Sequence, residues 1–139
     1  MDATDLIKLH EGCRLKPYRC TANKLTIGWG RNLDDNGIDQ EEADFMLDSD
    51  VIAVEKELGS NLSWFCSLDE VRQAVLTDMC FNLGWPRLSA FKKTLQHIEG
   101  GHYELAAIEM LNSKWARQVK NRAARLSEMM QSGKWPEVT

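Results

Sequence analysis

β-Structure is favoured in a single segment of this sequence, Arg14-Leu-Lys-Pro-Tyr-Arg-Cys-Thr-Ala-Asn-Lys-Leu-Thr-Ile-Gly-Trp-Gly-Arg31. Alternating residues at its start and β-forming residues at its end flank the turn-prone Thr21-Ala-Asn-Lys24, which is the pattern of a β-hairpin. Two glycines, Gly28 and Gly30, flank Trp29 and indicate bends or a close approach of the backbone to another group. The segment therefore predicts a small β-lobe.

The residues on either side of this segment favour helices. A short amphipathic helix is predicted from about residue 4 to residue 10, and Gly12 is expected to stop it, which leaves Glu11 at its C-terminal end. After a turn at 34–37, Asp39 and Glu42 have the spacing of an N-cap and its reciprocal partner. They open a long helix that Gly59 is expected to close.

The rest of the chain is expected to be helical. Ser67 and Glu70 match a capping box that opens an almost wholly apolar helix, and Gly84 ends it before three or four shorter helices. The fold class is therefore α+β, mainly α. The 139 residues are expected to form one domain, with a β-hairpin lobe at about 12–38, a connecting helix at about 39–59 and a helical lobe at about 60–139.

Composition argues against several classes of protein. With 17 Lys+Arg against 21 Asp+Glu, the chain has a formal charge of −4, and it has no nucleic-acid-binding motif, so no nucleic acid is expected as a partner. No apolar run approaches the ~18 residues of a membrane span. The four cysteines lack metal-ligand spacing, so neither a metal nor a cofactor is expected. The bases between Lys114 and Arg125 form either a solvated helix face or a surface for an anionic polymer.

Three residues, Glu11, Cys20 and Thr26, point to a particular chemistry. Eight residues separate the first pair and five the second. This spacing resembles the catalytic pattern of the phage-type lysozymes (glycoside hydrolase family 24), which is Glu, eight residues, Asp or Cys, five residues, Thr. The resemblance covers nearly the whole chain through further short sequences: Glu11-Gly-Cys-Arg-Leu-Lys-Pro-Tyr18, Leu25-Thr-Ile-Gly-Trp-Gly30, Asp69-Glu-Val-Arg-Gln-Ala74, Asp78-Met-Cys-Phe-Asn82, Ser113-Lys-Trp115 and Asn121-Arg-Ala123.

The resemblance implies a lysozyme-like fold of two lobes and an endolysin activity. It implies hydrolysis of the β-1,4 bond between N-acetylmuramic acid and N-acetylglucosamine in bacterial peptidoglycan. Asn32, Phe81 and Thr94 stand at the family's sugar-binding positions, with a place in the core as the alternative for Phe81. Arg122 matches an arginine that reaches from the helical lobe toward the catalytic glutamate. The chain departs from the family at 34–38, where longer members carry an additional strand and helix, and at Cys20, where the best-known members have Asp.

Cleavage of a glycosidic bond needs a proton for the leaving oxygen and a group that supplies or steadies a nucleophile at the anomeric carbon. Glu11 is the candidate acid, because a helix C-terminus and a partly apolar cleft both favour the protonated carboxyl. Cys20 is a thiolate nucleophile, a group that orients water, or an inert residue, and the basic side chains near it would favour the thiolate: Lys16, Arg19 and Lys24. The hydroxyl of Thr26 can bind a water, and Trp29 is the tryptophan best placed to stack on a sugar.

Two other functions are open at this point. A peptidoglycan-binding module weakened in catalysis would account for the thiol at position 20. A cysteine peptidase using Cys20 and His10 would leave Glu11 and Thr26 unexplained. We expect a monomer whose partner is bacterial peptidoglycan. Because residues 1–10 lack the apolar core of a secretory signal, we expect the enzyme to collect in the host bacterial cytoplasm until it is released to the cell wall.

Overall fold

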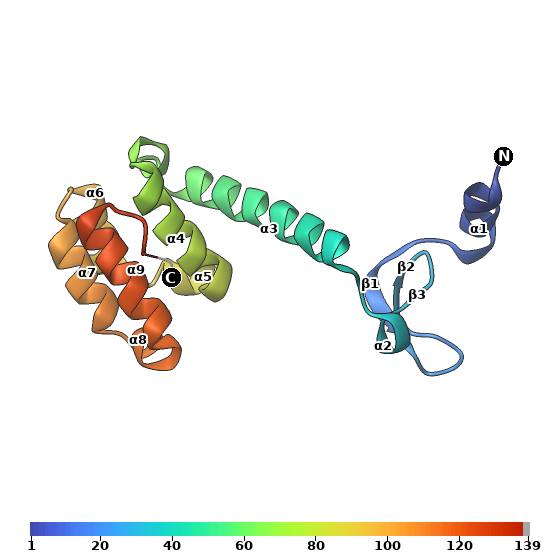
Figure 1. The fold of residues 1–139 in the computed structure, drawn as a ribbon. Helices are drawn as coiled ribbons and strands as arrows, with labels where there is room; N and C mark the ends of the chain where they lie inside the picture. The colour runs from blue at the N-terminus through green and yellow to red at the C-terminus, as the bar shows by residue number, and fades with distance from the viewer. Residues whose placement is uncertain (138–139) are drawn as a thin grey trace. The chain divides into compact units, whose positions relative to one another are not determined.

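The computed structural model describes residues 1–137, which form two compact units, one of residues 1–47 and one from residue 48 onward. The division falls within a long helix, α3 (Gln40–Asn61). Figure 1 labels the helices and strands of both units. The chain is mainly helical with one small antiparallel sheet, which confirms the expected α+β class.

The first unit contains a helix, a sheet and a short second helix: α1 (Ala3–Glu11), β1 (Arg14–Arg19), β2 (Leu25–Gly28), β3 (Arg31–Asn32) and α2 (Leu33–Asn36). α1 ends at Glu11 as predicted, and Gly12 follows it at φ +70°. The strands pair in the order β1-β2-β3, so the predicted hairpin gains a third strand after the bend at 28–30. Two residues are too few to show the alternation by which sequence reveals a strand.

The N-terminus of α3 agrees with the prediction and its C-terminus does not. The Glu42 backbone N–H donates to Asp39 Oδ1 at 2.8 Å, and Glu42 Oε1 accepts from the Asp39 N–H at 3.0 Å, which completes the capping box. The expectation that Gly59 closes this helix is wrong, because α3 continues to Asn61. A glycine ends a helix by turning to positive φ, and Gly59 does not do so.

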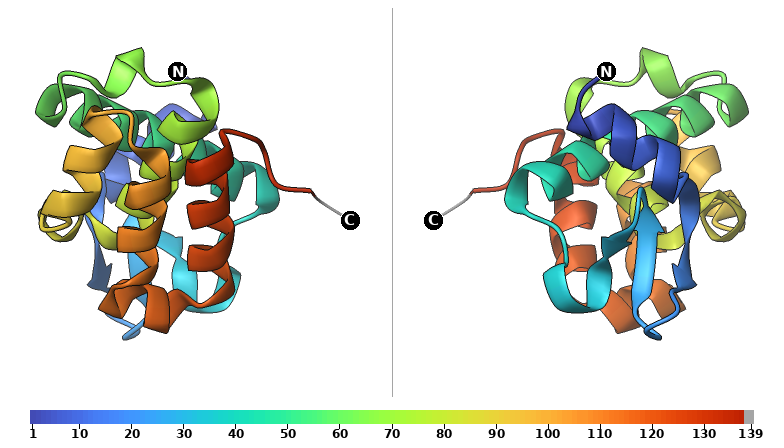
Figure 2. Two further views of the ribbon diagram at one scale, coloured as in Figure 1. Left: turned by 90° about the vertical axis from the view of Figure 1, so that its left-hand side faces the viewer. Right: turned by 90° about the vertical axis from the view of Figure 1, so that its right-hand side faces the viewer.

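The second unit continues with a single 3-10 turn and six helices: η1 (Phe65–Ser67), α4 (Glu70–Leu83), α5 (Trp85–Leu88), α6 (Lys92–Glu99), α7 (Tyr103–Leu111), α8 (Lys114–Val119) and α9 (Asn121–Ser132). Helix α7 packs against α6 and α9, and α9 also contacts α4 (Figures 1 and 2). Their apolar faces meet in a core that includes Leu76, Met79, Ile98, Met110 and Met130.

The start of α4 differs from the prediction. Ser67 belongs to the 3-10 turn, and the helix begins at Glu70. Asp69 is the N-cap, since its side chain accepts a hydrogen bond from the Arg72 backbone N–H at 3.0 Å. Leu68 is extended and separates the 3-10 turn from the helix, so Ser67 lies two residues before the position of the N-cap.

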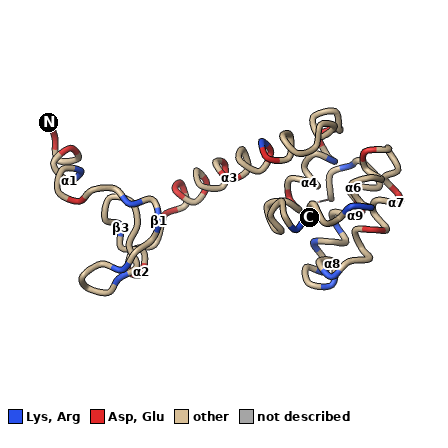
Figure 3. The backbone as a smooth tube through the Cα atoms, turned by 180° about the vertical axis from the view of Figure 1, so that it is seen from behind, with Lys and Arg blue, Asp and Glu red and all other residues tan. Residues whose placement is uncertain are grey.

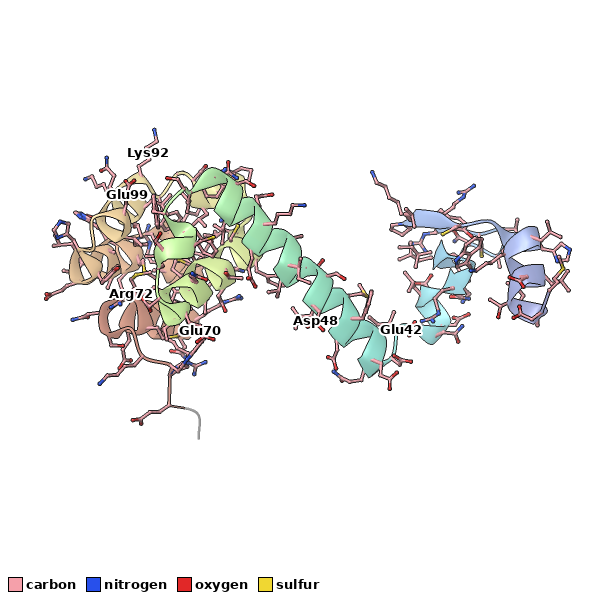
Figure 4. All side chains as sticks on the ribbon, turned by 90° about the horizontal axis from the view of Figure 1, so that it is seen from above. Glu42, Asp48, Glu70, Arg72, Lys92 and Glu99 are labelled. Atoms are coloured by element: carbon pink, nitrogen blue, oxygen red, sulfur yellow. The ribbon has the colours of Figure 1, made fainter. Side chains whose placement is uncertain are left out.

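Charge is distributed unevenly over the helices. Figure 3 shows acidic residues along α3 and basic residues at α8. Arg72, labelled in Figure 4, lies on α4 and donates to the carbonyls of Met130 and Gln131 at the end of α9, at 2.7 and 3.0 Å. It thereby caps carbonyls that have no partner within α9. Among residues 1–137, every helix is too short or too polar to traverse a lipid bilayer.

Candidate active site

Glu11 contacts the turn between β2 and β3. A Cβ built on Gly30 would stand 3.2 Å from Glu11 Oε2 and 3.5 Å from its carboxyl carbon. Lys8, one helical turn earlier, places its ammonium 5.3 Å from the centre of the Trp29 ring. The close approach that the two glycines predict is therefore confirmed at Gly30, and the approaching group is the candidate acid.

Cys20 follows β1 and opens the turn that leads to β2. Its N–H donates to the Lys24 carbonyl at 3.0 Å, and its carbonyl accepts from the Asn23 N–H at 2.8 Å. Hydrogen bonds from the backbone of Lys24 and Ala22 lower the pKa of the Cys20 thiol below its ordinary value, and the Thr26 hydroxyl acts in the same direction. The turn therefore favours the thiolate.

The cause of this shift differs from the expected one. Two of the basic side chains that were expected to favour the thiolate bind carboxylates instead: Arg19 pairs with Asp34 at 3.2 Å, and Lys24 pairs with Asp35 at 3.1 Å. Backbone donors take their place, because the chain folds back tightly between Cys20 and Lys24. Sequence composition alone does not reveal such donors.

Thr26 is the one buried residue of the first unit within the described chain. It lies on the central strand and is paired with Tyr18 on β1 and with Asn32 on β3. Its hydroxyl donates to the Lys24 carbonyl at 2.9 Å. With its proton so directed, the oxygen keeps lone pairs that can accept a hydrogen bond from a water.

Asn32, a predicted sugar-binding residue, also has a structural role. Its Oδ1 accepts from the Asp35 N–H at 3.0 Å, and its Nδ2 donates to Asp35 Oδ2 at 2.9 Å. The side chain thus caps α2, and both ends of the amide are already engaged within the unit. A sugar would have to share these groups.

A groove in the first unit runs beside Asn32, and the residues that line it are largely apolar: Trp29, Ile38, Phe45 and Met46. Arg31 and Glu42 meet there in a two-pronged ion pair, with Arg31 Nη1 2.9 Å from Glu42 Oε1 and Nη2 bound to Oε2. The Arg31 side chain, together with the Asp39 backbone N–H, lowers the pKa of Glu42 to about 2. The groove thus combines apolar side chains with an ion pair.

Three candidates lie in the second unit. Phe81 on α4 is 46% exposed, so its ring is not part of this unit's core. Thr94 on α6 is buried. Arg122 on α9 binds Asp78 on α4, with Nε 2.8 Å from Oδ1, and so joins two helices of the bundle.

Thr94 lines a groove of the second unit that also contains basic residues, and the sequence predicted only some of these. Leu83, Phe91 and Trp115 form its apolar part, and Trp115 is held by a hydrogen bond from Nε1 to Asn82 Oδ1 at 2.8 Å. Four cations and one acid line it as well: Arg87, Lys92, Lys93, Lys114 and Glu109. Lys114 belongs to the basic run visible in the sequence. The other cations come from separate segments that only folding brings together.

The described residues offer little for a metal. Among residues 1–137, no three His, Cys, Asp or Glu side chains gather as a metal site would require. The three candidate catalytic residues, Glu11, Cys20 and Thr26, all belong to the first unit.

Comparisons with known proteins show the family of the chain. Residues 8–129 match the phage lysozyme family. The chain belongs to this family. Relatives include a protein named probable T4-type lysozyme 2 in Dictyostelium discoideum, 30% identical over 93% of each chain. An endolysin of Acyrthosiphon pisum secondary endosymbiont phage 1 is 31% identical over 84% of this chain and 78% of its own. The protein is accordingly a lysozyme-type glycosidase that acts on peptidoglycan.

Proposed function

We propose that this chain hydrolyses the β-1,4 bond between N-acetylmuramic acid and N-acetylglucosamine, with Glu11 as the general acid. The observation that carries the proposal is the seating of the Glu11 carboxyl against Gly30, in the turn that follows the strand of Thr26. A carboxyl that this contact holds in place can give its proton to the leaving oxygen of a bound sugar.

Cys20 and Thr26 supply the second half of the reaction in this proposal. The bond from the anomeric carbon to the leaving oxygen breaks as Glu11 donates its proton to that oxygen. The anomeric carbon gains a new bond by one of two routes. The Cys20 sulfur bonds to it and is then displaced by a water that gives its proton to the ionised Glu11, or a water oriented by the Thr26 hydroxyl bonds to it directly and gives its proton to the Cys20 thiolate. Support comes from the backbone of Lys24 and Ala22, whose hydrogen bonds lower the pKa of the Cys20 thiol and so favour the thiolate.

We propose that residues from each of the two units bind the substrate. Asn32, Phe81 and Thr94 are proposed sugar-binding residues, and Arg122 is a proposed supporting residue for the acid. The cations around Thr94 fit the carboxylates of the peptides that peptidoglycan carries. The protein is proposed to act as a monomer, held in the host bacterial cytoplasm until it is released to the cell wall.

The test replaces Glu11 by Gln, which keeps the shape of the side chain and removes the transferable proton. The release of new reducing sugar ends from purified peptidoglycan should fall at least ~10²-fold, with an unchanged melting temperature. Glu41→Gln, an equally conservative change on α3, should keep full activity. Near-normal release by Glu11→Gln would contradict the assignment of the acid.

The same Glu11→Gln protein serves as a probe of binding, because it should sediment with cell walls without clearing them. In that background, Lys92→Gln with Lys93→Gln should weaken sedimentation, and added salt should reduce the difference. If the unaltered protein also sediments without releasing reducing ends, the chain is a binding module rather than an enzyme. Cys20, in place of the family's Asp, is the feature that favours this second candidate.

A further inference from the structure

The end of α1 reaches the β-sheet through two neighbouring contacts. Lys8 lies over the ring of Trp29, and the Glu11 carboxyl lies against Gly30. Trp29 and Gly30 are consecutive residues of the turn between β2 and β3, and Lys8 and Glu11 are one helical turn apart. Within residues 1–47, the Glu11 side chain makes no hydrogen bond. Within this unit, the position of the Glu11 carboxyl is therefore restricted by its steric contact with the turn at Gly30.

Position 30 can make this contact only as glycine. Its φ is +97°, a backbone conformation that L side chains rarely adopt. Independently of that, a Cβ would stand 3.2 Å from Glu11 Oε2 and 3.9 Å from Cγ, so the carboxyl or the turn would have to move by a few tenths of an ångström. Other positive-φ glycines of this unit lack such a neighbour: a Cβ on Gly37, at φ +57°, meets nothing within 4 Å.

We propose that Gly30 is a positioning residue for the reaction, whose bare Cα forms the seat that fixes the Glu11 carboxyl. The inference rests on the proposed role of Glu11 as the acid. Proton transfer requires the donor to stay within hydrogen-bond reach of the leaving oxygen, and a displacement of ~1 Å can lower a rate ~10²-fold. An added methyl group at position 30 acts on this geometry without touching the chemical identity of the acid.

The experiment compares Gly30→Ala with Gly37→Ala on purified peptidoglycan. Both variants place alanine at positive φ and should lower the melting temperature, but only the first presses on Glu11. Gly30→Ala should reduce kcat about tenfold or more with KM changed less than about twofold, and it should displace the pH–activity profile. Gly37→Ala should keep the kcat and the profile of the unaltered protein. A normal kcat and profile in Gly30→Ala would overturn the inference.

A second measurement does not depend on activity. In a Glu11→Ala background the carboxyl is absent, so Gly30→Ala should lower the melting temperature less than it does beside an intact Glu11. If Gly30→Ala alone does not fold, recovery of folding in the double variant supports the contact, and failure to recover overturns it. Additive losses of melting temperature would likewise overturn it. Activity retained in Glu11→Gln would instead remove the proposed acid, whatever this coupling shows.

Discussion

At position 20, the local fold compensates for an unusual side chain. A thiol is a poor substitute for a carboxylate while it is protonated, because it carries no charge and accepts hydrogen bonds weakly. The turn after β1 directs hydrogen bonds from the backbone of Lys24 and Ala22 to the sulfur, which lowers the pKa of Cys20. The shift is toward the charged form, which is the form that the family's Asp has at neutral pH.

If this thiolate takes part in catalysis, Cys20→Asp should retain activity within about tenfold, and Cys20→Ala should lose it by ~10²-fold or more. Alkylation by iodoacetamide should abolish activity, with a pH midpoint below that of an ordinary thiol. Cys13 and Cys66 are exposed and should be replaced by Ser before labelling. Equal activity of the Ala and Asp variants at equal stability would make Cys20 a bystander.

At the scale of elements, an ion pair joins the end of the sheet to the long helix. Arg31 of β3 binds Glu42 in the first turn of α3, and Arg31 Nη1 also donates to the Gly37 carbonyl at 3.1 Å. Glu42 in turn completes the capping box with Asp39. One carboxylate therefore fixes both the start of the helix and its attachment to the strand before it.

This arrangement predicts a pH dependence of stability. The folded Glu42 keeps its charge down to a pKa of about 2, whereas an unfolded glutamate takes up its proton near ~4.3. The stability from this pair is thus fully present above about pH 4.3 and is lost as the pH falls toward about 2. Glu42→Gln should lower the melting temperature at pH 7 and flatten its decline in acid. Glu41→Gln should leave both unchanged; an acid decline in Glu42→Gln as steep as in the unaltered protein would contradict this.

At the scale of the whole molecule, the two units differ in how much they bury. Among the described residues, all of the buried apolar side chains belong to the second unit, from Leu58 to Met130. The first unit, taken by itself, buries only Thr26 among the described residues. Hydrophobic burial must offset the loss of conformational entropy on folding, and one buried side chain does not do so.

A fragment of residues 48–139 should therefore fold and melt cooperatively, while a fragment of residues 1–47 should remain largely unfolded in water. Far-UV circular dichroism during heating measures both. The intact chain should melt in a single transition, in keeping with the predicted single domain of residues 1–139. A cooperative melt of the 1–47 fragment, or two separate transitions of the intact chain, would contradict these expectations.

The features of the fold that could be predicted from the sequence are local. Caps, glycines and hydrophobic spacing act within a few residues, so they predicted the end of α1 at Glu11, the capping box at Asp39 and Glu42, and the bend around Trp29. The spacing of Glu11, Cys20 and Thr26 indicated the family for the same reason, since it lies in one continuous segment.

Contacts between residues far apart in the sequence could not be predicted and became visible in the folded chain. The Gly30 seat for Glu11, the Asp34 and Asp35 partners of the basic side chains near Cys20, and the cations collected around Thr94 join residues from separate elements. Gly59 is a further example of a wrong local prediction, because this glycine was expected to end α3 and the helix continues past it. These contacts depend on packing and electrostatic interactions between separate segments. The residues next to each position in the sequence do not reveal the energies of those interactions.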